Sequence, residues 1–188
     1  FDKEAENSLW KLTSLNSQQS TLNKWYISDS LYISSDNGVS ATYSNKSTKT
    51  WAYRTFDMKE GVYTISFDWK AQGDGADYMR VLLIPALSQF TEGSADVFNF
   101  DGSVVTLSAA RQSYPKDWID LGREGRVFNS SVHWDTYSRT FLVTPEMAGF
   151  YRLVVFWEND NMSASASNMS AVIDNLFIEK SSCSYPYN

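Results

Sequence analysis

The sequence contains one cysteine and one histidine among 188 residues. A single cysteine cannot form a disulfide within the monomer, so no disulfide framework holds the fold. Hydrolysis by a thiol or serine nucleophile needs a partner base. The one histidine, His133, lies in a strand-like run, and Cys183 lies in a serine-rich tail. Because G-x-S-x-G, H-E-x-x-H and C-x-x-C motifs are also missing, the sequence disfavours a catalytic triad and a zinc site.

Long apolar runs and clusters of basic residues are missing as well. No apolar stretch reaches the roughly 18 residues of a membrane-spanning helix, so we expect no membrane insertion. The net charge is −6, with 16 basic and 22 acidic side chains. Neutralising phosphates needs clustered Lys and Arg, so nucleic acid is not an expected partner.

Aromatic residues, by contrast, are abundant, at 15% of the chain with 7 Trp and 11 Tyr. In residues 62–70, four apolar side chains alternate with smaller or polar ones: Tyr63, Ile65, Phe67 and Trp69. Strict alternation is typical of a half-buried strand. The same alternation recurs along the chain between Gly- and Asn-containing turns, and no long segment has a helical period. The sequence therefore predicts an all-β fold, an antiparallel two-sheet jelly-roll sandwich.

The chain is interpreted as one domain over residues 1–180, followed by a linker or tail at 181–188. Residues 62–70 and 78–84 are expected to form a hairpin in which Asp68 lies beside Arg80. The segment 86–117 is long for a bare loop, so it should carry short elements of its own or form a functional lobe. The polar segment 159–170 is expected to be a surface loop.

The predicted ligand site is Trp157, Glu158, Asn159 and Asp160, where an apolar strand meets that surface loop. An exposed aromatic ring there would stack on a sugar, while Glu158 and Asn159 would hydrogen-bond its hydroxyls. The alternative is that Trp157 belongs to the core and the acids are merely solvated. Trp10 and Trp118, near expected loops, are the other candidates for an exposed tryptophan.

A structural calcium ion is the metal hypothesis that the residues permit. Hard cations bind carboxylates, amides and main-chain carbonyls. Asp2, Glu4 and Glu6 crowd the N-terminus, and Asp174 interrupts the apolar last strand AVIDNLFIE. An inward carboxylate would be costly unless it were paired or bound to metal. The alternative is that Asp174 faces solvent or accepts main-chain N–H groups.

Several strings along nearly the whole chain resemble one known group: FDKEAENSLWKL, GVYTISFDWKAQGDGADYMRVLLIP, GFYRLVVFWENDN and AVIDNLFIEK. They are similar to the choice-of-anchor J and cleaved-adhesin domains, relatives of MAM domains in bacterial surface proteins. The resemblance implies a β-sandwich of carbohydrate-binding-module type, an extracellular or cell-surface location, and neighbouring domains such as fibronectin type III. It also implies a structural calcium between the first and last strands, at Asp2 and Asp174. It implies no catalytic residues.

The sequence therefore favours a non-catalytic extracellular binding or adhesion module, with a glycan or a surface protein as its ligand. A small jelly-roll glycoside hydrolase is the first alternative, because any two strands could supply its two carboxylates. Asp68, Asp135, Glu158 and Asp160 are candidates, although the E-x-D-x-x-E strand of laminarinase-like glucanases is absent. The second alternative is a structural spacer within a larger surface protein.

Overall fold

The computed structural model describes residues 1, 3–13, 23–108, 114–122, 127–162 and 169–182. Asp2 and Cys183 lie outside these ranges, as do half of the predicted loop 159–170 and most of the predicted tail. The described elements are almost entirely strands. The helical segments among them are α1 (Glu4–Asn7) and the short 3-10 helix η1 (Pro145–Met147). No described helix has the length and apolar character needed to cross a membrane.

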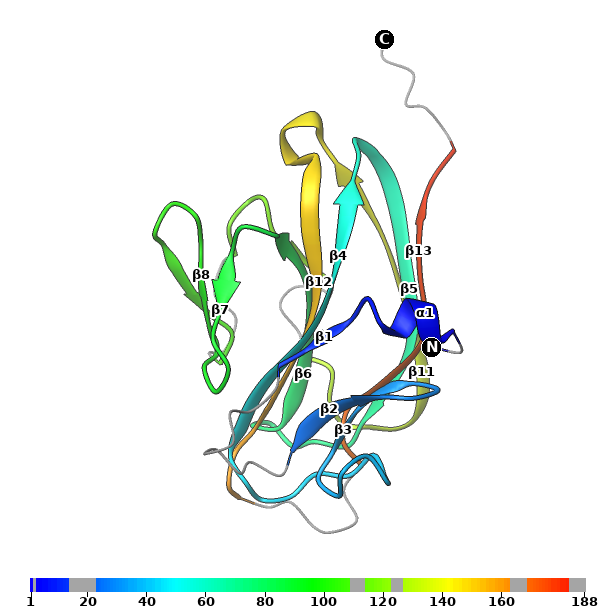
Figure 1. Ribbon diagram of the computed structural model, residues 1–188, viewed down its shortest axis with the longest axis vertical. Helices are drawn as coiled ribbons and strands as arrows, with labels where there is room; N and C mark the ends of the chain where they lie inside the picture. Colours follow the sequence, from blue (N-terminus) through cyan, green and yellow to red (C-terminus); the bar gives the residue numbers. More distant parts are fainter. Residues whose placement is uncertain (2, 14–22, 109–113, 123–126, 163–168, 183–188) are drawn as a thin grey trace.

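Two five-stranded antiparallel sheets face each other, which confirms the predicted jelly-roll sandwich (Figure 1). The first, called the covered sheet, has the order β1-β4-β12-β6-β10: β1 (Lys11–Leu12), β4 (Thr48–Met58), β12 (Gly149–Asn159), β6 (Tyr78–Pro85) and β10 (Ile119–Asp120). The second, called the open sheet, has the order β11-β5-β13-β3-β2: β11 (Ser131–Val143), β5 (Gly61–Ala71), β13 (Val172–Lys180), β3 (Leu31–Ser34) and β2 (Lys24–Ile27).

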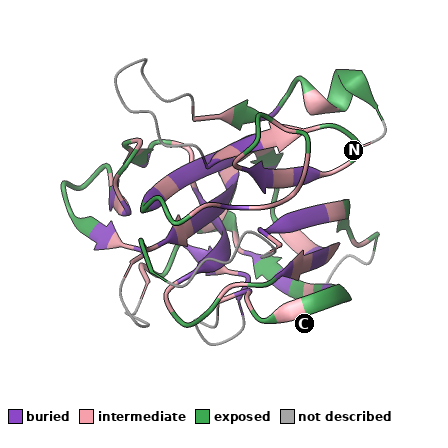
Figure 2. Ribbon diagram, turned by 90° about the horizontal axis from the view of Figure 1, so that it is seen from below, coloured by how far each residue is buried: buried purple, intermediate pink, exposed green. Residues whose placement is uncertain are grey.

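The main core lies between these sheets and follows the alternation of the sequence. On β5, the side chains of Tyr63, Ile65, Phe67 and Trp69 are buried, while their neighbours are half-exposed. Burial of such side chains is the main stabilising contribution to a fold of this kind. Figure 2 shows the buried residues along the strands and the exposed ones mainly in the connecting loops.

A small lobe covers the outer face of the covered sheet. It is the three-stranded sheet β7 (Gln89–Phe90), β8 (Asp96–Phe98) and β9 (Val104–Thr106), beside β6 and β12 in Figure 1. A second hydrophobic core fills the interface and includes Trp51, Leu82, Val97 and Phe156. This confirms that the segment 86–117 carries elements of its own, and it explains why β6 is buried on both faces.

The predicted hairpin is wrong, because its two strands belong to different sheets. β5 pairs with β11 and β13, whereas β6 pairs with β12 and β10. Residues 72–77 carry the chain from one sheet to the other, so Asp68 and Arg80 are not cross-strand neighbours. Alternation reports which side chains are buried, but it does not report which strand is the hydrogen-bonded partner.

Candidate functional site

Trp157, the predicted sugar-stacking residue, is a core residue. Its side chain is 0% exposed, its ring packs edge-to-face on Tyr43 at 5.2 Å between centroids, and its indole N–H donates to Asn159 Oδ1 at 2.9 Å. Its side chain faces the main core between the two sheets, so solvent cannot reach it. The expectation of an exposed ring here is therefore wrong.

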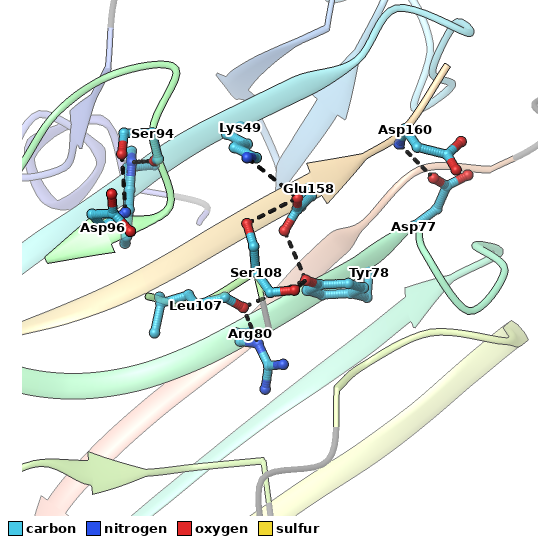
Figure 3. Close-up of polar contacts among 11 residues, drawn as sticks. Lys49, Asp77, Tyr78, Arg80, Ser94, Asp96, Leu107, Ser108, Glu158 and Asp160 are labelled. Atoms are coloured by element: carbon cyan, nitrogen blue, oxygen red, sulfur yellow. Dashed lines mark hydrogen bonds and ion pairs between the residues drawn. The ribbon is translucent and has the colours of Figure 1, made fainter. Parts of the chain in front are cut away.

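Glu158 points to the lobe side of the covered sheet and holds the end of the lobe (Figure 3). Its carboxylate accepts hydrogen bonds from the hydroxyls of Tyr78 at 2.7 Å and Ser108 at 2.9 Å, and lies 3.7 Å from Lys49 Nζ. Arg80 Nε donates to the neighbouring carbonyl of Leu107 at 2.8 Å. Burial, followed by the bond to Glu158, raises the pKa of Tyr78. These contacts give Glu158 a structural role, and its ligand role stays a prediction.

Asn159 and Asp160 continue into a second polar network. The buried Asn159 amide donates to the carbonyls of Lys46 at 2.8 Å and Asp160 at 2.9 Å. The main-chain N–H of Asp160 donates to Asp77 Oδ1 at 2.9 Å, and Tyr43 donates to the other oxygen at 2.6 Å. Burial raises the pKa of Asp77, which is only 1% exposed. A carboxyl group that is sealed in this way cannot contact a substrate.

The exposed tryptophan is Trp134, on the outer face of the open sheet. Its side chain is 49% exposed, whereas Trp10 and Trp118 are buried. Ser131 pairs with Ala71 and Asp135 with Trp69, so residues 132–134 form a bulge opposite Lys70 alone. A bulge changes the direction in which the side chains of a strand point. Here Lys70 Nζ lies over the Trp134 ring, 4.6 Å from its centre. This cation–π contact fixes one exposed aromatic ring on a strand.

An ordered carboxylate lies one residue pair along the same face. Asp68 Oδ1 accepts from the Thr136 hydroxyl at 2.5 Å, and Oδ2 accepts from the Asn175 amide at 2.8 Å. These hydrogen bonds, Thr136 first, lower the pKa of Asp68, so its carboxylate is ionised at neutral pH. We call these residues the Trp134 platform: Lys70, Trp134, Asp68, Thr136 and Asn175.

Aromatic side chains lie at both ends of one row across the open sheet. Beyond Lys70, the strand register places Val172, Tyr32 and Tyr26 in succession. The two tyrosine rings stack at 6.2 Å, and the Tyr32 hydroxyl donates to the Gly38 carbonyl at 2.7 Å. Five strands at 4.7–4.9 Å spacing extend over about 19 Å. Val172, in the middle of the row, is only 3% exposed, so the row has an aromatic group at each end but is not one continuous open surface.

The metal prediction falls partly outside the described residues, because Asp2 is not among them. Asp174 lies on β13 with its side chain 28% exposed, and its Oδ1 is 3.8 Å from the Phe1 amino group and accepts from Asn175 N–H at 2.7 Å. Within the described ranges, no three His, Cys, Asp or Glu side chains are grouped closely enough to hold a metal ion. A calcium site there would have to recruit amide and carbonyl oxygens as well.

The comparisons with known proteins concern the fold. No protein-family model matches the chain. No curated protein matches it either, so the choice-of-anchor J resemblance stays a prediction. One similar solved structure is the carbohydrate-binding module TmCBM61 in complex with β-1,4-galactotriose, with 10% identity, a TM-score of 0.44, and coverage of 93% of this chain and 90% of that one.

Two further structures have the same general likeness. The CBM22-2 xylan-binding domain of Paenibacillus barcinonensis Xyn10C is 13% identical, with a TM-score of 0.40 and 92% of each chain covered. The enzymatically active domain of bacteriophage CBA120 tailspike protein 4 is 11% identical with a TM-score of 0.48, and the match covers 92% of this chain but 19% of that one. At such identities the likeness describes the course of the backbone alone.

The sequence does contain a signal for Trp134. Tyr137, Phe141 and Val143 are buried on β11, so the alternating phase places Thr136 and Trp134 on the outer face. His133 lies in a strand-like run of the sequence, but the run alone does not show which of its side chains face outward. The contact with Lys70 could not be inferred, because it depends on the bulge and on the pairing of β11 with β5.

Proposed function

We propose that this protein is a non-catalytic glycan-binding module and that the Trp134 platform is its ligand site. The observation that carries the proposal is the half-exposed Trp134 ring, held on a strand by Lys70 beside a hydrogen-bonded carboxylate. The apolar C–H face of a pyranose ring is attracted to the electron-rich face of an indole ring. A ring that is already fixed loses little conformational freedom on binding.

The polar members of the platform suit sugar hydroxyls. The ionised Asp68 carboxylate keeps acceptor capacity beyond its bonds to Thr136 and Asn175, so it can accept from a hydroxyl group. Hydrogen bonds to a charged group are stronger than those between neutral groups. The Lys70 ammonium supplies donors beside the same ring. Together, these groups offer both hydrogen-bonding roles that a hydroxyl group needs.

The carboxyl groups support a binding role over hydrolysis. A glycosidase needs one carboxyl group with a raised pKa to act as general acid. The pKa of Asp68, on the exposed face, is lowered. Burial raises the pKa of Asp77, which is sealed in the core, and of Glu92, which lies between β7 and β8 of the lobe and not on the open sheet. The extracellular or cell-surface location, the adhesion role and the neighbouring fibronectin type III domains belong to the same proposal.

A glycan-array screen followed by titration calorimetry on the best ligand tests the proposal. Trp134→Ala should weaken binding by at least about tenfold, equivalent to roughly 1.4 kcal/mol, with little change in melting temperature. Phe150→Ala is the matched control, because Phe150 is 64% exposed but lies on the covered sheet. Unchanged affinity of Trp134→Ala would contradict the proposed site. Release of reducing sugar that is lost in Asp68→Asn would show an enzyme instead.

A further inference from the structure

β11 is a long strand at the edge of the open sheet. In the described part of the chain it pairs with β5 on one side and has no neighbouring strand on the other. The other edge strands of the described sheets are short: β1, β7 and β10 have two residues each, β9 has three and β2 has four, whereas β11 has thirteen. An open edge is a template for pairing with another chain, and natural sheets limit it by keeping edge strands short. The long edge of β11 is therefore a candidate interaction surface.

β11 carries one carboxylate and one guanidinium group, and they are placed symmetrically in the strand. Tyr137 is its middle residue, Asp135 precedes it by two positions, and Arg139 follows it by two. Asp135 is exposed and takes part in none of the ion pairs of the described residues. Arg139 donates from one guanidinium nitrogen to the carbonyl of Asp120, which uses part of its five-donor capacity. Both charges can therefore still be paired by a partner.

Two copies of β11 complement each other when they run antiparallel about a two-fold axis at residue 137. In this register Asp135 of each copy lies opposite Arg139 of the other, so both charges of both copies are paired across the new strand boundary. We propose that β11 is the edge through which this protein self-associates. A second copy of the chain pairs with it, and the two five-stranded open sheets join into one ten-stranded sheet.

The uncharged positions of β11 also suit this register. Exposed Thr136 lies opposite Ser138 of the other copy, and both are small hydroxyl residues. Towards the ends of the strand, Val132 lies at the level of Leu142 of the other copy. Both are about half-exposed in the single chain, and their contact would remove apolar surface from water. Because 131 and 143 are equally far from residue 137, the register uses the whole length of the strand in both copies.

Charged side chains on an edge strand can instead prevent pairing. Charges of one sign serve that purpose best, because they repel their copies wherever they meet. β11 has opposite signs at equal distances from its middle residue, so the two-fold register is attractive. A shift of the register by two residues in either direction separates Asp135 from Arg139 and removes both ion pairs. The same two side chains therefore favour self-pairing and specify its register.

The dimer would place two Trp134 platforms on one outer face, because the strands of a joined sheet share their faces. Trp134 of one copy would lie at the level of Thr140 of the other, so the two rings would be six residues apart along the strands, about 20 Å. Under the proposed glycan-binding function, two sites on one face would bind a long glycan more tightly than either alone. The association itself does not rest on that function.

Sedimentation velocity without any glycan tests the proposal. An edge-strand contact belongs to the weaker class of interfaces, so the concentration series should run from about 1 µM to 1 mM. The wild type should pass from the mass of one chain to twice that mass. Asp135→Arg and Arg139→Asp should each raise the dissociation constant by at least about tenfold, because like charges then face each other. An equal mixture of these two variants should restore association, because opposite charges face each other again.

Asp29→Arg is the matched control. Asp29 is exposed in the turn between β2 and β3, at the opposite edge of the open sheet, and the substitution makes the same change of charge. This variant should associate like the wild type. Amide hydrogen exchange gives a second measurement, since protection of β11 should rise with protein concentration while that of β2 stays constant.

A wild type that stays monomeric to the highest concentration would overturn the proposal, and would show that the charges of β11 guard an open edge. It would also be wrong if Asp135→Arg associated as the wild type does, or if the mixture of variants, each with the wild-type circular dichroism spectrum, stayed monomeric. Larger assemblies would contradict the closed two-fold pairing. Loss of the glycan-binding proposal would change none of these results, so the two proposals can fail separately.

Discussion

The two sheets of this sandwich are built from similar alternating strands, yet they differ in how many faces are buried. The covered sheet has the main core on one side and the lobe on the other: Trp157 on its strand β12 faces the main core, and Trp51 on β4 lies under the lobe. The open sheet has a buried inner face and an outer face that carries Trp134 on β11. Trp157 and Trp134 thus lie in opposite environments, and in the described part of the chain the lobe leaves only the open sheet with an outer face that could take the proposed ligand.

The largest expected loss of stability follows from a substitution on the covered sheet. Trp157→Ala should lower the free energy of unfolding by about 3–5 kcal/mol, because it leaves a cavity among tightly packed side chains. Trp134→Ala, the matched substitution on the open sheet, should change it by about 0.5 kcal/mol or less. Urea denaturation of both variants measures the difference. Equal losses would show that the two tryptophans are packed alike, and the comparison of the sheets would fail.

A smaller loss of stability is expected from a substitution at Glu158, where the lobe is attached to the covered sheet. Glu158→Gln keeps the size of the side chain but removes the charge that Tyr78, Ser108 and Lys49 share. We expect a loss of about 1 kcal/mol. Amide hydrogen exchange should accelerate at Leu107, whose N–H bonds to the Ala95 carbonyl in the lobe, and stay unchanged at Phe67 in the main core. Unchanged exchange at Leu107 would show that Glu158 does not hold the lobe.

The smallest effect concerns the pH dependence contributed by Asp77. Its pKa is raised in the folded state, mainly by burial, so the native protein favours the protonated form. The stability that this group contributes is fully present below its unfolded pKa of about 3.9 and is lost as pH rises through the folded pKa. Asp77→Asn keeps an acceptor oxygen for the Asp160 N–H, can donate from its amide nitrogen to the Tyr43 hydroxyl, and removes the titration.

Unfolding free energies of the wild type and Asp77→Asn should therefore diverge as pH rises from about 3 to 7, with the variant gaining relative to the wild type. Measuring the difference between the two proteins removes the opposite contribution of Asp68, whose pKa is lowered. A constant difference across this range would show that burial does not perturb Asp77.

The sequence was sufficient for the fold class, but not for the pairing of the strands or for the candidate site. The alternation of Tyr63, Ile65, Phe67 and Trp69 predicted a half-buried strand, and the structure confirms it. Trp157 has a plausible position for a ligand site near a strand end, but its burial depends on which face of β12 is turned to the main core. The contact between Trp134 and Lys70 depends on a bulge and on the pairing of β11 with β5. The hydrophobic periodicity of the sequence predicts neither of them.

The most direct test of the account is to follow the indole N–H signals of the seven tryptophans by heteronuclear NMR while the best glycan is added. Assignment by single substitution identifies the signals of Trp134 and Trp157. We predict that the Trp134 signal shifts progressively with ligand concentration while the Trp157 signal stays in place. A shift of the Trp157 signal with an unchanged Trp134 signal would contradict the central claim that the ligand binds on the open sheet.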